Sequence, residues 1–256
     1  MKNYLQNSLR LFRLSFDLYD HHLPRFFMTM VLPLLFLVLL NYSLFYFIFT
    51  PDFLDRVSNE DPAATWQFRG VMVIAGAMLL VVMVLFQIVL FKTIEAADQG
   101  KKLGIAEGYW TAWSLSGQFL FTILLILIKA VLWTFVFIVP GFVFSLLYSL
   151  ASIVYLFDGK KGMEALKESK RLIKLKWDQY LFNLLFVGAM VFIVYWISDL
   201  LLANTFGVNY GDGEFSMLAA IGEGLFYLFT IMLSLFPPVF IYYQYKDLLV
   251  FSKIKA

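Results

Sequence analysis

The sequence predicts an all-α, polytopic integral membrane protein with six transmembrane helices. Three observations support this fold class: a composition that is 61% apolar and only 15% charged, six long apolar segments, and positive charges concentrated on alternate connections. A soluble domain is about 45–50% apolar and about 25% charged. A water-soluble fold of this composition would leave large apolar areas exposed to water, so lipid is expected to be the main solvent of the chain.

Six segments have the length and composition of membrane spans. A helix crosses the bilayer core with about 20 mostly apolar residues. The predicted spans are residues 26–49, 70–91, 119–139, 142–157, 180–203 and 217–245. Only Pro140 and Gly141 separate the third span from the fourth, and they predict a tight hairpin, because proline cannot continue a helix and glycine tolerates left-handed backbone angles. The alternative is one kinked helix, but the combined segment is about twice as long as a bilayer requires.

The positive charges predict how the spans are oriented. Of the 20 Lys and Arg residues, 17 lie in the N-terminal segment, the second and fourth connections and the C-terminal tail. Arg56 and Arg69 lie on the opposite side, and Lys129 lies inside the third span. Because cytoplasmic connections carry an excess of Lys and Arg, both termini are predicted to be cytoplasmic.

Prolines predict two further features of the helices. Asp61 and Pro62 are typical of a helix start, with the aspartate as N-cap and the proline in the first turn, so the second helix is expected to begin before the membrane. Pro237 and Pro238 are expected to kink the sixth span, because each removes a backbone donor and clashes with the preceding turn.

The chain is predicted to be a single six-span domain, residues 1–256, with an amphipathic interfacial helix over residues 1–24. One stripe of that helix is apolar, whereas Arg10 and Arg13 project elsewhere. Such a pattern is typical of a helix that lies in the cytoplasmic interface of a membrane. The alternative is a helix that packs on the protein's own spans. The stripe consists of Leu5, Leu9, Phe12, Phe16 and Tyr19.

The fourth connection carries seven cations and is predicted to form a basic cytoplasmic helix over residues 158–179. In a helix, Met163, Leu166, Ile173 and Trp177 would share one face and the cations would project elsewhere. One interpretation is a surface that binds anionic lipid headgroups or a protein partner. The alternative is a basic loop that only sets topology. The candidate binding residues are Arg10, Arg13, Lys167, Lys170, Arg171 and Lys174.

Three ionisable residues fall within or near the predicted spans. Lys129 is near the middle of the third span, Asp199 near the outer end of the fifth, and Glu223 about two turns into the sixth. Charges within a membrane are functional candidates because burying them is costly. A Lys129–Glu223 pair would suit a proton or ion relay. The alternative is that Lys129 snorkels and the acids lie at headgroup level.

The sequence carries no catalytic or metal-binding constellation. It has no cysteine, and its two histidines, His21 and His22, are adjacent and therefore point in different directions on a helix. No metalloprotease, phosphate-loop or nucleophile-elbow motif is present. We therefore expect no enzymatic activity, no metal and no cofactor. The net charge of +2 does not indicate a nucleic-acid partner.

Residues 100–180 resemble a bacterial family. The similarity rests on residues 102–108 (KLGIAEG), residues 138–141 (IVPG) and residues 157–169 (FDGKKGMEALKES). The family comprises the membrane domain of glycerophosphoryl diester phosphodiesterases and its stand-alone six-span relatives. Asp158 matches the acidic residue that the family usually has after the fourth span. The phosphodiesterase barrel is absent from this chain, so the resemblance does not imply that activity. It implies a bacterial inner-membrane location and a supporting role in the envelope.

These observations favour a non-enzymatic inner-membrane protein, expected to be a scaffold or accessory subunit of a membrane or envelope complex. Its expected partners are anionic membrane lipids, a membrane protein or a second copy of the chain. The alternative is a small transporter or permease subunit that uses Lys129 and Glu223.

Overall fold

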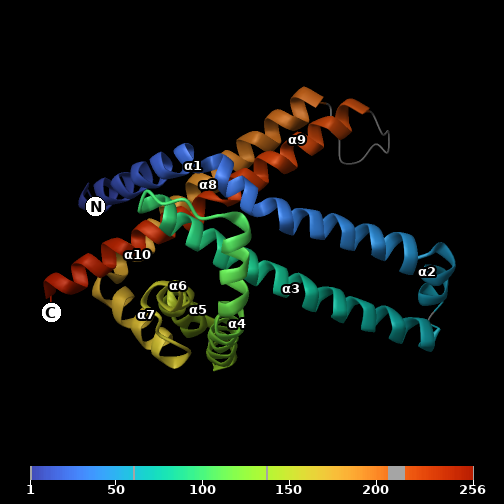
Figure 1. The fold of residues 1–256 in the computed structure, drawn as a ribbon, viewed down its shortest axis with the longest axis horizontal. Coiled ribbons are helices and arrows are strands. Elements are labelled where there is room, and N and C mark those ends of the chain that lie inside the picture. Colours follow the sequence, from blue (N-terminus) through green and yellow to red (C-terminus); the bar gives the residue numbers. More distant parts are fainter. Residues whose placement is uncertain (1, 60, 137, 207–216, 256) are drawn as a thin grey trace. The chain divides into compact units, whose positions relative to one another are not determined.

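The structure is a computed structural model, and it describes residues 2–59, 61–136, 138–206 and 217–255. Within these ranges every regular element is a helix (Figure 1). In chain order they are α1 (Lys2–Ser43), the π-helix η1 (Leu44–Ile48), α2 (Pro51–Ser58), α3 (Pro62–Asp98), α4 (Ile105–Val136), α5 (Ile138–Tyr148), α6 (Ala151–Asp158), α7 (Met163–Leu175), α8 (Trp177–Phe206), α9 (Met217–Ser234) and α10 (Phe236–Lys255).

The chain divides into two compact units. The hairpin unit is Pro24–Leu124, and the terminal unit combines Met1–Leu23 with Leu125–Ala256. The first helix runs from one unit into the other at Pro24 without a break, although the sequence predicts separate interfacial and spanning segments there.

The hairpin unit is built on α1 and α3, which run side by side and are joined through α2 (Figure 1). Thr50 caps α2 by accepting a hydrogen bond from the Phe53 backbone N–H at 3.3 Å. Asp61 caps α3 by accepting one from Ala63 at 3.0 Å, so the predicted helix start at Asp61 and Pro62 is confirmed. A small apolar core of Phe49, Phe53 and Ala64 fixes this end of the hairpin.

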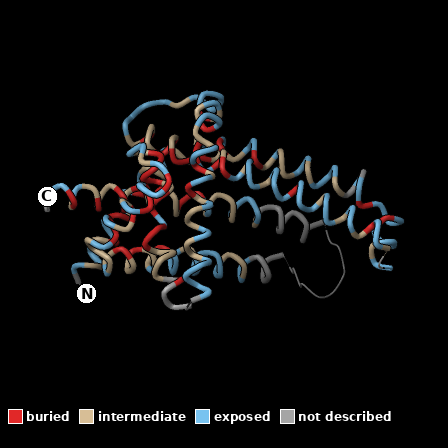
Figure 2. Tube along the Cα trace, turned by 90° about the horizontal axis from the view of Figure 1, so that it is seen from below, coloured by how far each residue is buried: buried red, intermediate tan, exposed pale blue. Residues whose placement is uncertain are grey.

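The terminal unit holds a denser core. Figure 2 shows buried positions crowded near the two labelled termini, which both belong to this unit. The short helix α6 is buried on several sides, with Ile153 and Val154 at 1% and 0% exposure. Gly159 ends α6 in the left-handed conformation at φ 69°, which glycine adopts without a steric penalty. The chain then enters α7, which packs against α5, α6 and α10.

The predicted hairpin at Pro140 and Gly141 falls close to residue 137, which separates α4 from α5 and lies outside the described residues. Gly141 packs so closely that a Cβ there would lie 2.8 Å from the Thr134 Cα. Trp133 stacks on Phe144 with ring centroids 4.1 Å apart. The ends of the two helices therefore lie against each other.

The predicted fourth span is not one helix. It is divided into α5 and α6 at Ser149 and Leu150. The Ser149 hydroxyl shares a hydrogen bond with the Tyr180 hydroxyl at 2.6 Å and bonds the Leu146 carbonyl at 2.7 Å. Such local side-chain bonds compete with the helical ladder. Near Pro237 and Pro238, where the sequence predicts a kink, the helix is interrupted for one residue at Leu235, between α9 and α10. The segment Phe226–Ile254 still counts as one span, so the kink itself stays a prediction.

Five of the described helical segments are long and apolar enough to cross a membrane. They are Asn3–Ser43, Pro62–Asp98, Ile105–Phe135, Trp177–Leu201 and Phe226–Ile254. A sixth exists only if Val143–Asp158 and Met163–Leu175, which meet at 114°, count as one broken span. The architecture is thus that of a helical protein suited to a membrane, and the fourth predicted span is its least regular part.

Candidate basic surface

Helix α7 is a rigid platform because its apolar face is buried in the terminal unit. Leu166, Leu172 and Ile173 are at most 1% exposed. The buried Ser169 hydroxyl donates to the Leu147 carbonyl at 2.8 Å, which ties α7 to the end of α5. The predicted basic helix is therefore present over Met163–Leu175. Met163 departs from the predicted apolar face, since its side chain is 44% exposed.

The opposite face of α7 carries cations that differ in whether a carboxylate or an aromatic ring lies next to them. Lys167 and Lys174 are exposed, and neither forms an ion pair with a carboxylate in the described part of the chain. The Lys170 ammonium lies 5.4 Å from the centre of the Phe144 ring, a cation–π contact that holds the side chain without neutralising it. These three residues, Lys167, Lys170 and Lys174, are referred to below as the α7 cations.

Arg171 differs from the α7 cations because a carboxylate neutralises it. Its Nε and Nη2 donate to the two Glu168 carboxylate oxygens at 2.9 and 2.6 Å. The Lys160 ammonium lies 3.1 Å from the same carboxylate. The hydrogen bond from Arg171 is the main cause that lowers the pKa of Glu168 to about 2, and Lys160 lowers it further. Glu168 therefore stays ionised at neutral pH and reduces the positive potential on its side of α7.

Arg10 is part of a junction between helices. Its Nη2 lies 2.5 Å from the Asp247 carboxylate on α10, and the Lys176 ammonium lies 3.7 Å from the other oxygen of that group. Asp247 thus connects α1, α10 and the start of α8. Arg13 is exposed three residues further along α1. In the described residues no hydrogen bond or ion pair joins Arg10 or Arg13 to the α7 cations, so the predicted binding set does not form one contact network.

The N-terminal segment of α1 packs on the protein's own helices. Ser8 donates to the buried Asn183 side chain at 2.6 Å, and Tyr4 bonds Asp178. Leu11 packs with Val187. Later residues of α1 contact later residues of α8, so the two segments run parallel to each other. This is the alternative that the amphipathic pattern left open, although Leu5, Leu9 and Phe16 of the apolar stripe remain 45–49% exposed.

One member of the predicted intramembrane pair, Glu223, lies outside the described side chains. Glu223 belongs to α9, but its side chain is not among those described. Lys129 and Asp199 are half-buried on α4 and α8. Neither forms an ion pair with a described residue. No group of three His, Cys, Asp or Glu residues able to hold a metal ion is found in the described ranges. The transporter hypothesis therefore stays a prediction.

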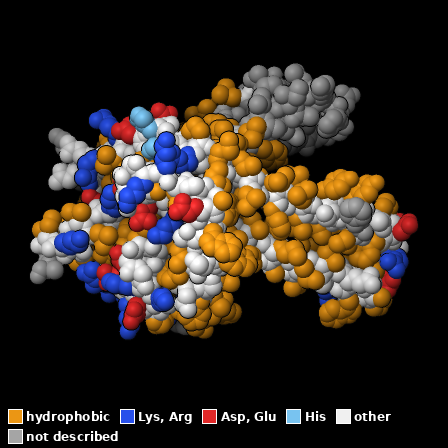
Figure 3. All heavy atoms as spheres, in the orientation of Figure 1, with side chains coloured by type: hydrophobic (Ala, Val, Ile, Leu, Met, Phe, Trp, Pro, Cys, Tyr) orange, Lys and Arg blue, Asp and Glu red, His pale blue; other side chains and the backbone are white. Residues whose placement is uncertain are grey.

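The hairpin unit has the surface of a membrane-crossing element. In Figure 3 hydrophobic side chains cover the arm that α1 and α3 form, and charged side chains gather at its tip. Exposed Trp66 and Arg69 lie near one end of α3, with the guanidinium 5.5 Å from the ring centre, and Lys92 lies near the other end. Arg69 and Lys92 are separated by about 35 Å of helix. That separation matches a hydrocarbon core plus part of its interfaces.

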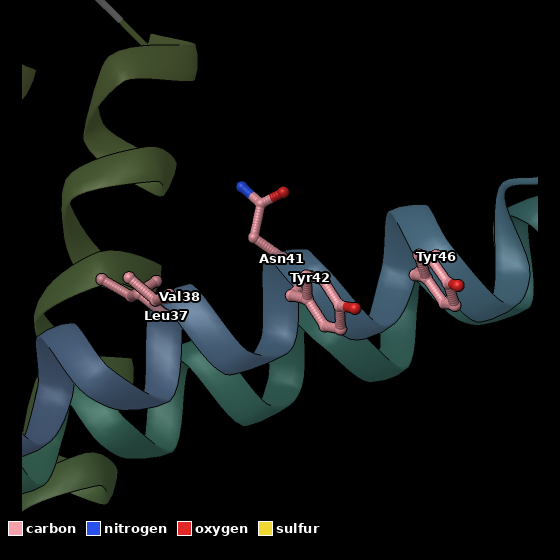
Figure 4. Close-up of a pocket in the computed structure, with 5 residues that line it drawn as sticks. All are labelled: Leu37, Val38, Asn41, Tyr42 and Tyr46. Atoms are coloured by element: carbon pink, nitrogen blue, oxygen red, sulfur yellow. The ribbon is translucent and has the colours of Figure 1, made fainter.

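One exposed side of α1 in this unit is partly polar. Figure 4 shows Asn41, Tyr42 and Tyr46 on the outward side of the helix, with Leu37 and Val38 one turn before. The Tyr42 and Tyr46 rings stack with centroids 5.3 Å apart. Four of these residues belong to α1 and Tyr46 to the π-helix η1 that continues it, so together they form only one wall. They enclose no site, and Tyr42 and Tyr46 suit an interface between lipid and water.

Comparison with protein-family models, with curated proteins and with solved structures finds no match for this chain.

Proposed function

We propose that this protein is a non-enzymatic scaffold or accessory subunit of a bacterial inner membrane, with both termini cytoplasmic, which binds anionic lipid headgroups through the α7 cations. The observation that carries the proposal is the fixed, two-sided character of α7. One side is buried in the terminal unit, and the other holds Lys167, Lys170 and Lys174 outward over two turns.

The spacing of the α7 cations supports binding to phosphate groups at a membrane surface. Residues three and four apart lie on the same side of a helix, so Lys167, Lys170 and Lys174 follow one line along α7. Each cation near an anionic membrane contributes about 1 kcal/mol of attraction. Three such charges would favour anionic over zwitterionic lipid by roughly a hundredfold. An acidic protein partner would use the same charges and is the competing outcome of the test.

The experiment is a measurement of lipid preference around the intact protein. The wild-type chain is reconstituted in nanodiscs that contain equal amounts of phosphatidylglycerol and phosphatidylcholine, and the lipids that remain bound after gentle release are counted by native mass spectrometry. We expect phosphatidylglycerol to be enriched at low salt. High salt should reduce the enrichment because it screens exposed charges. The triple variant with Lys167→Gln, Lys170→Gln and Lys174→Gln should lose most of the enrichment.

A matched variant removes the same charge elsewhere on the predicted cytoplasmic side. Lys101, Lys102 and Lys253 are also exposed, and their replacement by Gln changes the net charge equally. This control should keep the phosphatidylglycerol enrichment. Equal losses in both triple variants would mean that general charge, and not the α7 surface, attracts the lipid. Unchanged enrichment in the α7 variant, together with loss of a co-purifying acidic protein, would replace lipid by a protein as the ligand.

The predicted orientation needs a separate test. The chain has no native cysteine, so a single introduced cysteine is the only labelling site. Lys167→Cys and Lys253→Cys should resist a membrane-impermeant maleimide in intact cells, and Asp55→Cys should react. Labelling of Lys167→Cys from outside would contradict the orientation and the proposed access of α7 to the cytoplasmic leaflet.

A further inference from the structure

The terminal unit contains an apolar groove that the basic surface does not use. It has a volume of about 350 Å³ and lies between α1, α8 and the region where α9 meets α10. Among its described lining residues, the polar side-chain atom is the Tyr19 hydroxyl, which donates to the Met232 carbonyl at 2.7 Å. The lining includes Phe12, Phe16, Tyr19, Met190, Val194 and Met232.

Aromatic packing keeps the groove in shape. The Phe236 ring is 6% exposed and contacts the Phe12 ring at 5.2 Å between centroids and the Tyr19 ring at 5.7 Å. Phe236 also belongs to the buried cluster with Leu11 and Phe240. The base of the groove is therefore part of the core, whereas Phe16 and Val194 at its margin are 49% and 38% exposed. A groove of this kind is preformed and opens onto an apolar surface.

The size and lining decide between possible occupants. The exposed margin residues Phe16 and Val194 open the groove to the surroundings of the protein, which are lipid for a chain of this composition. The volume lies within the range of about 300–1,000 Å³ of small-molecule sites. An occupant must be thin, flexible and almost wholly apolar, which describes a lipid acyl chain.

Charge at the margin indicates what kind of lipid would fit. Arg13 is exposed and follows the lining residue Phe12 directly, and Asp20 is exposed and follows the lining residue Tyr19, so one cation and one carboxylate flank the α1 wall of the groove at positions seven residues apart. Arg13 forms no ion pair with a described carboxylate, including Asp17 one turn further along α1. Arginine binds phosphate through two parallel hydrogen bonds. The apolar stripe also continues from the groove to the exposed side chains of Leu9 and Leu5.

We propose that this groove holds one acyl chain of an anionic phospholipid, whose phosphate is bound by Arg13. The site is separate from α7: it would retain an individual lipid molecule, whereas the α7 cations would attract headgroups collectively. The lipid would fill the space between α1 and the α8–α9 pair and would thereby complete the packing of the N-terminal segment.

The first test counts the lipid that survives extensive detergent washing. Native mass spectrometry of the wild-type protein should show one retained phospholipid per chain. Val194→Trp should fill the groove and reduce retention at least fivefold. The matched control is Ile193→Trp, because Ile193 is the neighbouring residue on α8, is 47% exposed and does not line the groove. Equal retention in the two variants, or a wild-type protein without retained lipid, would overturn the proposal.

A second measurement uses the unaltered chain, so it holds even if Val194→Trp does not fold. Phosphatidylglycerol with a diazirine in its acyl chain is bound to the wild-type protein at about one lipid per chain, and labelled peptides are identified after illumination. Labels should concentrate on residues 190–194 and 229–233. The exposed residues 132–135 of α4 should be labelled less, although Leu132 and Phe135 are 60% and 85% exposed. Uniform labelling of both regions would show only nonspecific contact with lipid.

A third test addresses whether Arg13 binds the lipid headgroup. Arg13→Gln should reduce retention of phosphatidylglycerol about fivefold, which is the contribution of one cation at a lipid surface. Retention of phosphatidylcholine should fall less, because its choline cation already balances the charge of its phosphate. Equal losses of both lipids would contradict the preference for an anionic headgroup at Arg13. The triple α7 variant should keep its groove lipid, so failure of this site and failure of the proposed function can be told apart.

Discussion

Helix α7 and residues 2–23 of α1 are both amphipathic segments rich in cations, but their apolar faces end in different surroundings. The protein itself covers the apolar face of α7, where Leu166 and Ile173 are at most 1% exposed. In α1, Leu11 is buried, whereas Leu5 and Leu9 of the neighbouring stripe are about half exposed. An amphipathic pattern thus shows that the apolar face of a helix must be kept away from water. Whether protein or lipid contacts that face depends on the helices that fold next to it.

The two segments also differ in how their cations are balanced. In α7, Glu168 neutralises Arg171 and leaves Lys167 and Lys174 without an ion pair among the described residues. In α1, Arg10 contributes to a junction with Asp247, and Arg13 follows Phe12, which lines an apolar groove. We therefore propose different roles for similar positive charge: a headgroup-binding surface on α7, and packing plus a single-lipid site on α1.

The largest expected effect comes from truncating the covered face of α7. Leu172→Ala should lower the free energy of unfolding by about 2–5 kcal/mol, because it removes a fully buried side chain and leaves a cavity. Leu9→Ala on the exposed stripe of α1 should change it by less than about 0.5 kcal/mol. Denaturant unfolding in detergent, followed by circular dichroism, measures both. Equal losses would mean that the α1 stripe is covered as completely as the α7 face.

A smaller loss is expected where α1 does contact the protein. Ser8→Ala would leave the buried Asn183 side-chain oxygen without its hydrogen bond from Ser8, at a cost of about 1–3 kcal/mol in unfolding free energy. Ser114→Ala, at an exposed position, is the matched control and should change stability little. If Ser8→Ala proves as neutral as the control in the same unfolding assay, the N-terminal segment is not held against α8.

The smallest expected effect on stability concerns Glu168, and it depends on pH. Its folded pKa of about 2 lies below the unfolded value of about 4.3, so its ion pairs stabilise the fold above pH 4.3, and this stabilisation is lost as the pH falls toward 2. The difference in melting temperature between wild type and Glu168→Gln should therefore shrink between these pH values. A difference that stays constant would contradict the ion pairs.

Glu168→Gln also tests how far this carboxylate weakens the attraction of α7 for anionic lipid. Glu168→Gln releases Arg171 and Lys160 from their shared carboxylate without disturbing the buried face. In the nanodisc measurement it should increase phosphatidylglycerol enrichment at neutral pH, where wild-type Glu168 is ionised. An unchanged enrichment would show that the carboxylate does not limit the positive potential of this surface.

Local patterns in the sequence predicted much of the fold. Five of the six apolar segments lie in helices long enough to cross a membrane, the Asp61 cap begins α3, and α7 is an amphipathic helix. The division of the fourth segment at Ser149 was not predicted; it coincides with a hydrogen bond between Ser149 and Tyr180 on α8, a contact that no local pattern indicates. The groove was also missed. The signal that could have indicated it is the apolar stripe of α1, but the opposite walls come from α8 and α9.

The sequence by itself determined that the chain is helical, suited to lipid, and positively charged on alternate connections. These properties follow from composition and from periodicities of a few residues, which each segment carries independently of its neighbours. Only the tertiary structure decided which apolar faces are buried, that Glu168 pairs with Arg171 and Lys160, and that Phe12, Phe16 and Tyr19 line an apolar groove. Burial and pairing depend on contacts between residues far apart in the chain, and no local pattern encodes them.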